Sequence, residues 1–414
     1  MRSWNIFYRK KSYEGVGSLS SIAWKRFRKD KLAFGSLLFV CCVALLAILG
    51  YLVTPDSTPF ANNQHVEMAA KHPGFSVTML KVRKNQAADP TGIFKKMIYG
   101  KKNDYTEYPL YEWHFEGAYL IAEEYTGDIP NDGEIKKINL ADVVYPVKDS
   151  KNIIEKNNTL SFDDIDGTHY VVPISDLQEK IKNENIRSQT FMLGTDRYGR
   201  DMVSQLIIGA RVSLSVGFIS VFISLLIGIL LGSLAGFFRG WMDNIIVWFI
   251  NVVWSIPTLL LVIAITFALG KGFWQVFIAV GLTMWVDVAR VVRGQILSLR
   301  EKEFVEAGKA LGFRNFRIIF RHVLPNVMGP VIVISAANFA SAILTEAGLS
   351  FLGIGVQPPM PSWGTMIKEH YAYIILNSAH LAILPGIAIM LMVLAFMLIG
   401  NGLRDALDTR TAEK

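Results

Sequence analysis

The stretch "LIIGARVSLSVGFISVFISLLIGILLGSLAG" (residues 206–236) is an almost unbroken apolar run. A helix of roughly 20 apolar residues crosses the hydrocarbon core of a membrane, so this run predicts a transmembrane helix. Gly228, Gly232 and Gly236 recur at every fourth position within it. This spacing of small residues allows two helix backbones to approach closely in lipid. The three glycines therefore predict a helix-packing face, and a functional hinge is the alternative.

Apolar runs of similar length recur on both sides of this stretch. They lie at about 33–53, 244–269, 273–292, 327–349 and 381–400. The chain of 414 residues is 51% hydrophobic, carries a formal net charge of +7 and has a positive mean hydropathy, so it is too apolar for an ordinary soluble enzyme. We expect an all-α polytopic membrane protein with six transmembrane helices. Pro257 and Pro385 fall inside two of the runs and predict kinks there.

The first run is predicted to stay in the membrane. It follows a strongly basic stretch and lacks a small-x-small cleavage site after its apolar part, so it has the features of a retained anchor. Cys41 and Cys42, the only cysteines, are adjacent within it and offer neither a disulfide framework nor a zinc-binding spacing. We interpret them as small apolar residues that face lipid or pack in the bundle.

Basic residues are concentrated near the ends of particular spans. They lie before the first run (Arg9, Lys10, Lys11, Lys25, Arg26, Arg28, Lys29 and Lys31), between the second and third (Arg239) and between the fourth and fifth (Arg300, Arg314, Arg317 and Arg321). Six spans put these segments on one side, and the side rich in Lys and Arg is the cytoplasmic one. Both termini are therefore expected in the cytoplasm, and residues 54 to about 205 outside.

The outer segment is far too long for a connector and predicts a domain. Apolar residues alternate in Phe75, Val77 and Met79 and again in Tyr119 and Ile121, as in half-buried strands. Asn131-Asp132-Gly133 and Asp166-Gly167 have the composition of hairpin turns. We therefore expect a mixed α/β, strand-rich extracytoplasmic insert domain. Its acidic residues lack the later Glu of a calcium loop, so we interpret them as a solvated surface and predict no metal site.

The expected organisation has five parts. They are a cytoplasmic segment (1–32), the first transmembrane helix (33–53), the insert domain (54–192), a five-helix core (193–403) with a cytoplasmic coupling helix near 304–320, and a cytoplasmic tail (404–414).

Ionisable residues are scarce within the spans, which argues against a carrier driven by a carboxylate relay. Asp287 has Arg290 three positions later, so it either forms a local ion pair near the cytoplasmic end or lines a pathway. Glu346, near the outer end of the fifth span, either lines a pathway or lies at the interface. No inverted repeat, which many secondary transporters contain, is evident.

The segment "FVEAGKALGFRNFRIIFRHVLPN" (304–326) differs from its apolar neighbours. It is amphipathic and basic, so it either lies along the membrane surface or offers a face to a soluble partner. A glycine at 312 permits a tight turn, and a small residue at 307 permits close docking.

This segment resembles the EAA loop of ATP-binding-cassette (ABC) importer permeases, a coupling helix that docks on the ATPase subunit. The resemblance rests on "EAGKALG" (306–312) and "HVLP" (322–325). The matching coupling residues are Glu306, Ala307, Gly312, Leu324 and Pro325, together with Gly308 in place of the second alanine. His322 stands where isoleucine is commoner.

The resemblance extends over about residues 192–408. The stretches "LGTDRYGRDMVSQLIIGARVSLSVG" (193–217), "ARVVRGQILSLREKEFVEAGKALG" (289–312) and "TEAGLSFLGIGVQPPMPSWG" (345–364) are similar to the oligopeptide, dipeptide and nickel branch, and to its C-type permease. Residues 54–190 depart from the family, in which the first outer loop is usually much shorter. The implied fold is the six-helix importer-permease type in a bacterial inner membrane.

The resemblance implies a non-enzymatic permease subunit of an ATP-driven importer, with peptides as the expected substrate. Nickel or another small solute, and less so secondary transport, are the alternatives. The implied partners are a homologous permease in a heterodimer, two cytoplasmic ATPase subunits, an extracytoplasmic substrate-binding protein and lipid, with no nucleic acid. Gly270-Lys271-Gly272 and Gly308-Lys309-Ala310 lack the hydroxyl residue of a P-loop. We therefore expect no cofactor in this chain, and ATP and Mg²⁺ on the partner subunits.

Overall fold

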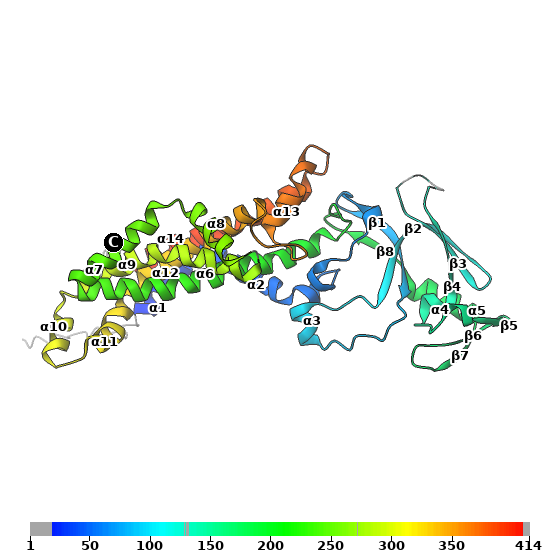
Figure 1. Cartoon of the computed structure of the whole chain (residues 1–414), viewed down its shortest axis with the longest axis horizontal. Helices are drawn as coiled ribbons and strands as arrows, with labels where there is room; N and C mark the ends of the chain where they lie inside the picture. The colour runs from blue at the N-terminus through cyan, green and yellow to red at the C-terminus, as the bar shows by residue number, and fades with distance from the viewer. Residues whose placement is uncertain (1–18, 128, 130–131, 271, 409–414) are drawn as a thin grey trace, which may run out of the picture.

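A computed structural model of the chain describes residues 19–127, 129, 132–270 and 272–408 (Figure 1). Of the residues named above, Arg9, Lys10, Lys11, Asn131 and Lys271 lie outside these ranges. The molecule is elongated, with a helical bundle at one end and a strand-containing region at the other (Figure 1).

Five helices of the described residues are long and apolar enough to cross a membrane. They are α2 (Lys31–Val53), α6 (Met202–Phe238), α9 (Phe273–Leu299), α12 (Leu324–Phe351) and α14 (His380–Leu407). An amphipathic helix, α1 (Leu19–Lys29), precedes them, and Asp30 caps α2 by accepting from the amides of Leu32 and Ala33.

The predicted continuous helix at 244–269 is wrong in shape. The segment forms α7 (Gly240–Ser255) and α8 (Thr258–Leu269), and the two axes are bent by 95°. Pro257 lacks an amide proton and disfavours helical geometry at the residue before it. Ile256 accordingly takes an extended conformation, with φ −91° and ψ 128°. The predicted kink is therefore a break.

The bent pair nevertheless carries the chain across the membrane, because α6 and α9 are parallel. Ser220, midway along α6, donates a hydrogen bond to the carbonyl of Phe277 near the start of α9 (3.0 Å). Near their ends, Gly236 of α6 lies against Ile296 of α9. Between two parallel neighbours the chain must return to the other end of the bundle, and α7 and α8 make that return. With the bent pair counted as one span, the described residues contain six candidate crossings, the number predicted.

The basic segments lie at one end of the bundle. Gly402 near the end of α14 lies against Ala33 near the start of α2, so these helices are antiparallel. Arg239, after α6, pairs with Glu301, after α9 (Nη2 to Oε1, 2.6 Å). The strand region lies at the opposite end (Figure 1). Which of the two ends faces the cytoplasm stays a prediction.

The strand region contains two antiparallel sheets. The larger has the order β4-β3-β2-β1-β8, made of β1 (Phe75–Arg83), β2 (Tyr105–Glu116), β3 (Tyr119–Glu124), β4 (Ile135–Asn139) and β8 (Ile186–Phe191). The smaller has the order β5-β6-β7, made of β5 (Ile154–Lys156), β6 (Thr159–Asp163) and β7 (His169–Pro173). Three short helices accompany them, α3 (Ile93–Tyr99), α4 (Leu140–Val144) and α5 (Ile174–Lys180). The prediction of a mixed α/β, strand-rich region is confirmed.

The predicted hairpin turn and the predicted strand alternations can be compared with the strands observed in this region. The hairpin at Asp166-Gly167 is confirmed, since it joins β6 to β7 and Gly167 has a φ of +80°. Phe75, Val77 and Met79 are buried in β1 as predicted. In β3 the predicted alternation is out of phase by one residue, because Leu120 and Ala122 face the core while Tyr119 is exposed.

Candidate functional site

The segment predicted as one coupling helix near 304–320 is two short helices. These are α10 (Glu303–Ala310) and α11 (Asn315–Ile318), and a π-helical turn (Ile319–Val323) then leads into α12. The expectation of a continuous helix is therefore wrong. The loop lies at the end of the bundle opposite the sheets (Figure 1).

Gly312 sets the break between α10 and α11. Its φ is +74°, in the left-handed region that side chains disfavour. Its amide donates to the carbonyl of Lys309 (2.9 Å), and the amide of Phe313 donates to that of Gly308 (3.0 Å). These two bonds make a Schellman motif, which satisfies carbonyls that a helix end leaves free. The tight turn expected at Gly312 is thus a left-handed helix cap, with open space around its α-carbon.

The loop has a buried side and an exposed side. Its buried residues pack on the ends of the spans; this cluster contains Phe237, Val288, Val292, Ile296, Val305, Ile318, Ile319, Val323, Val327 and Val331. The exposed side carries Phe304, Leu311 and Phe316, and Leu311 is 72% exposed. Three large apolar side chains exposed beside charged ones are typical of a contact surface.

The predicted coupling residues are divided between these sides. Glu306, Ala307 and Gly312 lie on the exposed side. Gly308 is buried, and a β-carbon there would lie 3.6 Å from atoms of Ile318 and Phe313, an ordinary contact. The remaining two, Leu324 and Pro325, form the first turn of α12. Pro325 has no amide proton to donate, and it lies just after the π-helical turn at Ile319–Val323, where the helical hydrogen-bond pattern is already irregular.

The three glycines of α6 face α9. A β-carbon at Gly228 would lie 2.5 Å from Cβ of Val288, and one at Gly232 would lie 2.6 Å from the carbonyl oxygen of Ala289. One at Gly236 would lie 2.9 Å from the carbonyl of Arg293. No side chain fits at these distances, so the glycines hold the two backbones in close contact along three turns.

Glu346 of α12 is 1% exposed and enclosed by hydroxyl groups. Ser350 donates to its Oε1 (2.7 Å), and Ser213 of α6 lies 3.4 Å from its Oε2. Of the two alternatives predicted for Glu346, a position at the membrane interface is therefore wrong. In this conformation Glu346 joins α6 to α12 inside the bundle.

Asp287 lies near the middle of α9, and the predicted ion pair with Arg290 is wrong. Arg290 instead places its guanidinium 3.6 Å from the ring centre of Trp254 and donates to Asn251 (3.3 Å), both on α7. Asp287 lines a cavity of about 250 Å³ beside the break between α7 and α8. The cavity is also lined by Asn338 of α12, whose buried amide nitrogen has no hydrogen-bond partner among the described residues.

A buried ionic junction that the sequence patterns did not reveal lies where the bundle meets the strand region. Arg200 donates from Nε to Asp196 (2.6 Å), from Nη2 to Glu369 (3.2 Å) and from Nη1 to Asn62 (3.2 Å). It thereby links the loop before α6 to α13 (Trp363–His370) and to the segment that follows α2. The motif "GTDRYGRD" that contains it was the available signal, but its partners are far away in the chain.

His370 at the end of α13 is fully buried beside this junction. Its Nδ1 lies 2.7 Å from the carbonyl of Met366, and its Nε2 accepts from the amide of Arg197 (3.4 Å). This assigns the neutral tautomer with the proton on Nδ1. Burial lowers the pKa of His370 below its usual 6.5, against the opposing effect of Asp196.

A dependence of stability on pH follows from His370. Its pKa is lower in the folded chain, so the unfolded chain binds the proton first as the pH falls below about 6.5, and folding loses stability there. We expect the melting temperature of the detergent-purified chain to fall on acidification below this pH. The melting temperature of the His370→Gln variant should fall less over the same pH range. An equal fall in both proteins would show that His370 does not contribute.

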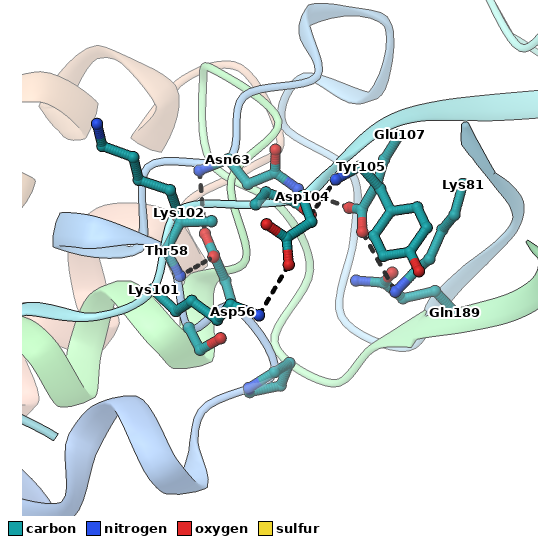
Figure 2. A pocket seen from close by; sticks show the side chains of 13 residues that line it. Asp56, Thr58, Asn63, Lys81, Lys101, Lys102, Asp104, Tyr105, Glu107 and Gln189 are labelled. Carbon is teal, nitrogen blue, oxygen red and sulfur yellow. Dashed lines mark hydrogen bonds and ion pairs between the residues drawn. The ribbon is translucent and has the colours of Figure 1, made fainter. Parts of the chain in front are cut away.

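A polar cavity of about 230 Å³ lies between the segment after α2 and the larger sheet (Figure 2). Four of its charged residues form two ion pairs. Lys101 pairs with Asp104 (2.8 Å) and Lys81 with Glu107 (3.2 Å). Asp56 accepts from two amides of its own segment. The cavity is therefore part of the contact between the segment after α2 and the larger sheet, rather than an open charged binding site.

Two family descriptions match the chain. Residues 228–413 match the binding-protein-dependent transport system inner membrane component. Residues 18–73 match the N-terminal transmembrane domain of oligopeptide transport permease C. Neither range includes residues 74–227, which hold both sheets.

Two known permeases are similar in sequence to about half of this chain. The dipeptide transport system permease protein DppC of Alkalihalophilus pseudofirmus is 44% identical over 218 residues, which is 52% of this chain and 71% of the relative. The glutathione transport system permease protein GsiD of Pectobacterium atrosepticum is 41% identical over 223 residues, 54% of this chain and 74% of the relative. A solved inward-facing MetNI methionine ABC transporter aligns at 18% identity over 50% of this chain and 98% of its own, with a TM-score of 0.43.

The extent of the DppC match settles the family, and the six candidate spans agree with it. The protein belongs to the binding-protein-dependent inner membrane transport components, and it is a multi-pass permease subunit of an ABC importer of the oligopeptide and dipeptide branch.

Proposed function

We propose that this permease forms the translocation pathway of a peptide importer as one half of a heterodimer with a homologous permease. Two cytoplasmic ATPase subunits bind ATP and Mg²⁺ and drive it, and an extracytoplasmic binding protein delivers the substrate. The names of the two relatives support a peptide substrate, since glutathione is itself a small peptide. The observation that carries the coupling role is the exposed apolar side of the loop at 303–318.

The proposed orientation puts this loop in the cytoplasm and the strand region outside. It is supported by the basic residues at the loop end, which are held on the cytoplasmic side during insertion. In this orientation Glu306, Ala307 and Gly312 are available to an ATPase. ATP-driven closure of the ATPase pair then favours one arrangement of the permease pair through that contact.

We assign Asp287 to the wall of the pathway. A carboxylate in the middle of a membrane helix is costly unless it serves a polar cavity or an ion pair. Asp287 lines a cavity with Asn338 and has no ion pair within 4.0 Å among the described residues. Glu346 is enclosed in this conformation, so it could line the pathway only after α6 and α12 separate.

The test is uptake by the reconstituted complex of both permeases, the ATPases and the binding protein. We expect ATP-dependent accumulation of a labelled dipeptide that requires the binding protein. ATP-dependent uptake of nickel that excess peptide does not inhibit would contradict the substrate. Peptide accumulation that persists with an inactive ATPase would contradict the transport class.

A further inference from the structure

The helix α3 (Ile93–Tyr99) of the strand region is unusual because none of its residues is buried. Phe94 is 80% exposed and Ile93 is 73% exposed, and Ile98 is also exposed. A short helix in a water-soluble domain normally places its apolar residues against the core. These side chains project away from the protein instead.

The sequence of α3 is amphipathic. Each helical residue advances by about 100°, which places the apolar residues within an arc of about 140°. These residues are Ile93, Phe94, Met97 and Ile98. Lys95, Lys96 and Tyr99 fall on the remaining arc. Apolar residues on one face and lysines on the other are typical of helices that lie in a membrane surface.

Contacts with two spans place α3 at the edge of the membrane. Arg211 of α6 donates from Nη1 to the carbonyl of Ile98 (2.8 Å), and its guanidinium lies 5.7 Å from the ring centre of Tyr51 in α2. The 23 residues of α2 rise about 34 Å at about 1.5 Å per residue, against a hydrocarbon core of about 30 Å. Tyr51, close to the end of α2, therefore lies at the membrane boundary, and Arg211 and α3 lie with it.

The apolar residues of α3 continue a lipid-facing surface that is already present. Leu45, Leu46, Ile48, Leu52 and Val53 of α2 are exposed apolar residues of a transmembrane helix. In Figure 1, α3 lies beside the end of the bundle from which the strand region projects. Lys95 and Lys102 are exposed on and just after α3 and provide the charge that lipid phosphates attract.

We propose that α3 lies in the membrane surface, with Ile93, Phe94 and Ile98 among the lipid chains and the lysines at the phosphate groups. A helix of seven residues binds a membrane weakly on its own. Here α2 and α6 already hold it at the bilayer, so the local concentration of lipid is high. The strand region is thereby attached to the membrane at a second place and is held in one orientation above the bundle.

The test measures the surroundings of a nitroxide label on the full chain. Cys41 and Cys42 are replaced by alanine, and Phe94→Cys is labelled in nanodiscs of phosphatidylcholine and phosphatidylglycerol. Oxygen concentrates in lipid and a nickel chelate in water. We expect a ratio of oxygen to nickel accessibility several-fold higher at Phe94 than at Val171→Cys, a similarly exposed apolar position on β7.

Each other result overturns the proposal. High nickel accessibility at both positions would mean that α3 is in water. Low accessibility to both reagents at Phe94 would mean that protein covers α3. A second variant, Lys95→Glu with Lys102→Glu, tests the charges. In nanodiscs with phosphatidylglycerol it should lower the ratio of oxygen to nickel accessibility of the label at Phe94. In pure phosphatidylcholine the ratio should fall less. An unchanged ratio in both kinds of nanodisc would contradict the proposed contact between the lysines and the lipid phosphates.

Discussion

Gly312→Val is expected to leave the permease inserted and paired but to abolish coupled uptake. The residue has a φ of +74°, and a β-branched side chain in the left-handed region costs roughly 1–2 kcal/mol. The chain can avoid this cost by opening the Schellman motif, which would turn α10 away from α11 and split the exposed contact surface. If docking requires the closed turn, attachment of the ATPase weakens roughly 5- to 30-fold. Subunit stoichiometry, stimulated ATP hydrolysis and uptake in reconstituted complexes measure this.

Two controls separate coupling from general damage. Gly167→Val puts the same side chain at a φ of +80° in similarly open space, but in the strand region, so it should not change ATPase binding. Gly308→Ala lies within α10, where the new methyl group meets only ordinary contacts and alanine favours the helix, so it should retain uptake. Glu306→Lys should weaken attachment less than Gly312→Val. Full attachment and uptake in Gly312→Val would contradict the coupling role and favour a helix that lies on the membrane.

The number of crossings could be predicted because each depends on a local property, the length of an apolar run. The shape of the third could not. Pro257 predicted an interruption, but the 95° bend depends on how α8 packs against α9, which no local pattern contains. The strands show the same limit. Tyr119 to Ala122 is apolar on both faces, so alternation alone could not decide that Leu120 rather than Tyr119 faces the core.

In the candidate site, too, residues of a local motif could be predicted, whereas residues that act through distant contacts could not. Glu306 and Gly312 could be named because they belong to one continuous motif whose local geometry, a helix followed by a left-handed cap, is encoded within a few residues. Arg200 and α3 could not be given roles. Arg200 acts through Glu369, which is 169 positions away, and α3 through Arg211, 113 positions from Ile98. Glu346 and Asp287 were found as charges in apolar runs, but Ser213 beside Glu346 and Asn338 beside Asp287 come from other helices.

Gly232→Leu is expected to prevent stable assembly of the bundle. A β-carbon at this position would lie 2.6 Å from the carbonyl oxygen of Ala289 and 2.9 Å from Cβ of Val292. The nearest atom belongs to the backbone and cannot rotate away, so α6 and α9 must separate along their whole contact. Overpacking of this kind costs roughly 1–3 kcal/mol and occasionally more. The melting temperature in detergent and the yield of folded protein should both fall sharply.

The same position distinguishes packing from the alternative role of a hinge. If Gly232 serves packing, Gly232→Ala already places a methyl group in the contact, so stability should fall in the order glycine, alanine, leucine, with transport lost in proportion. If it serves as a hinge, alanine should preserve stability while uptake disappears. Gly294→Leu in α9 is the matched control, because a β-carbon there meets nothing within 4 Å and should leave the melting temperature unchanged. Because the contact is set by backbone atoms, we expect the graded loss of stability.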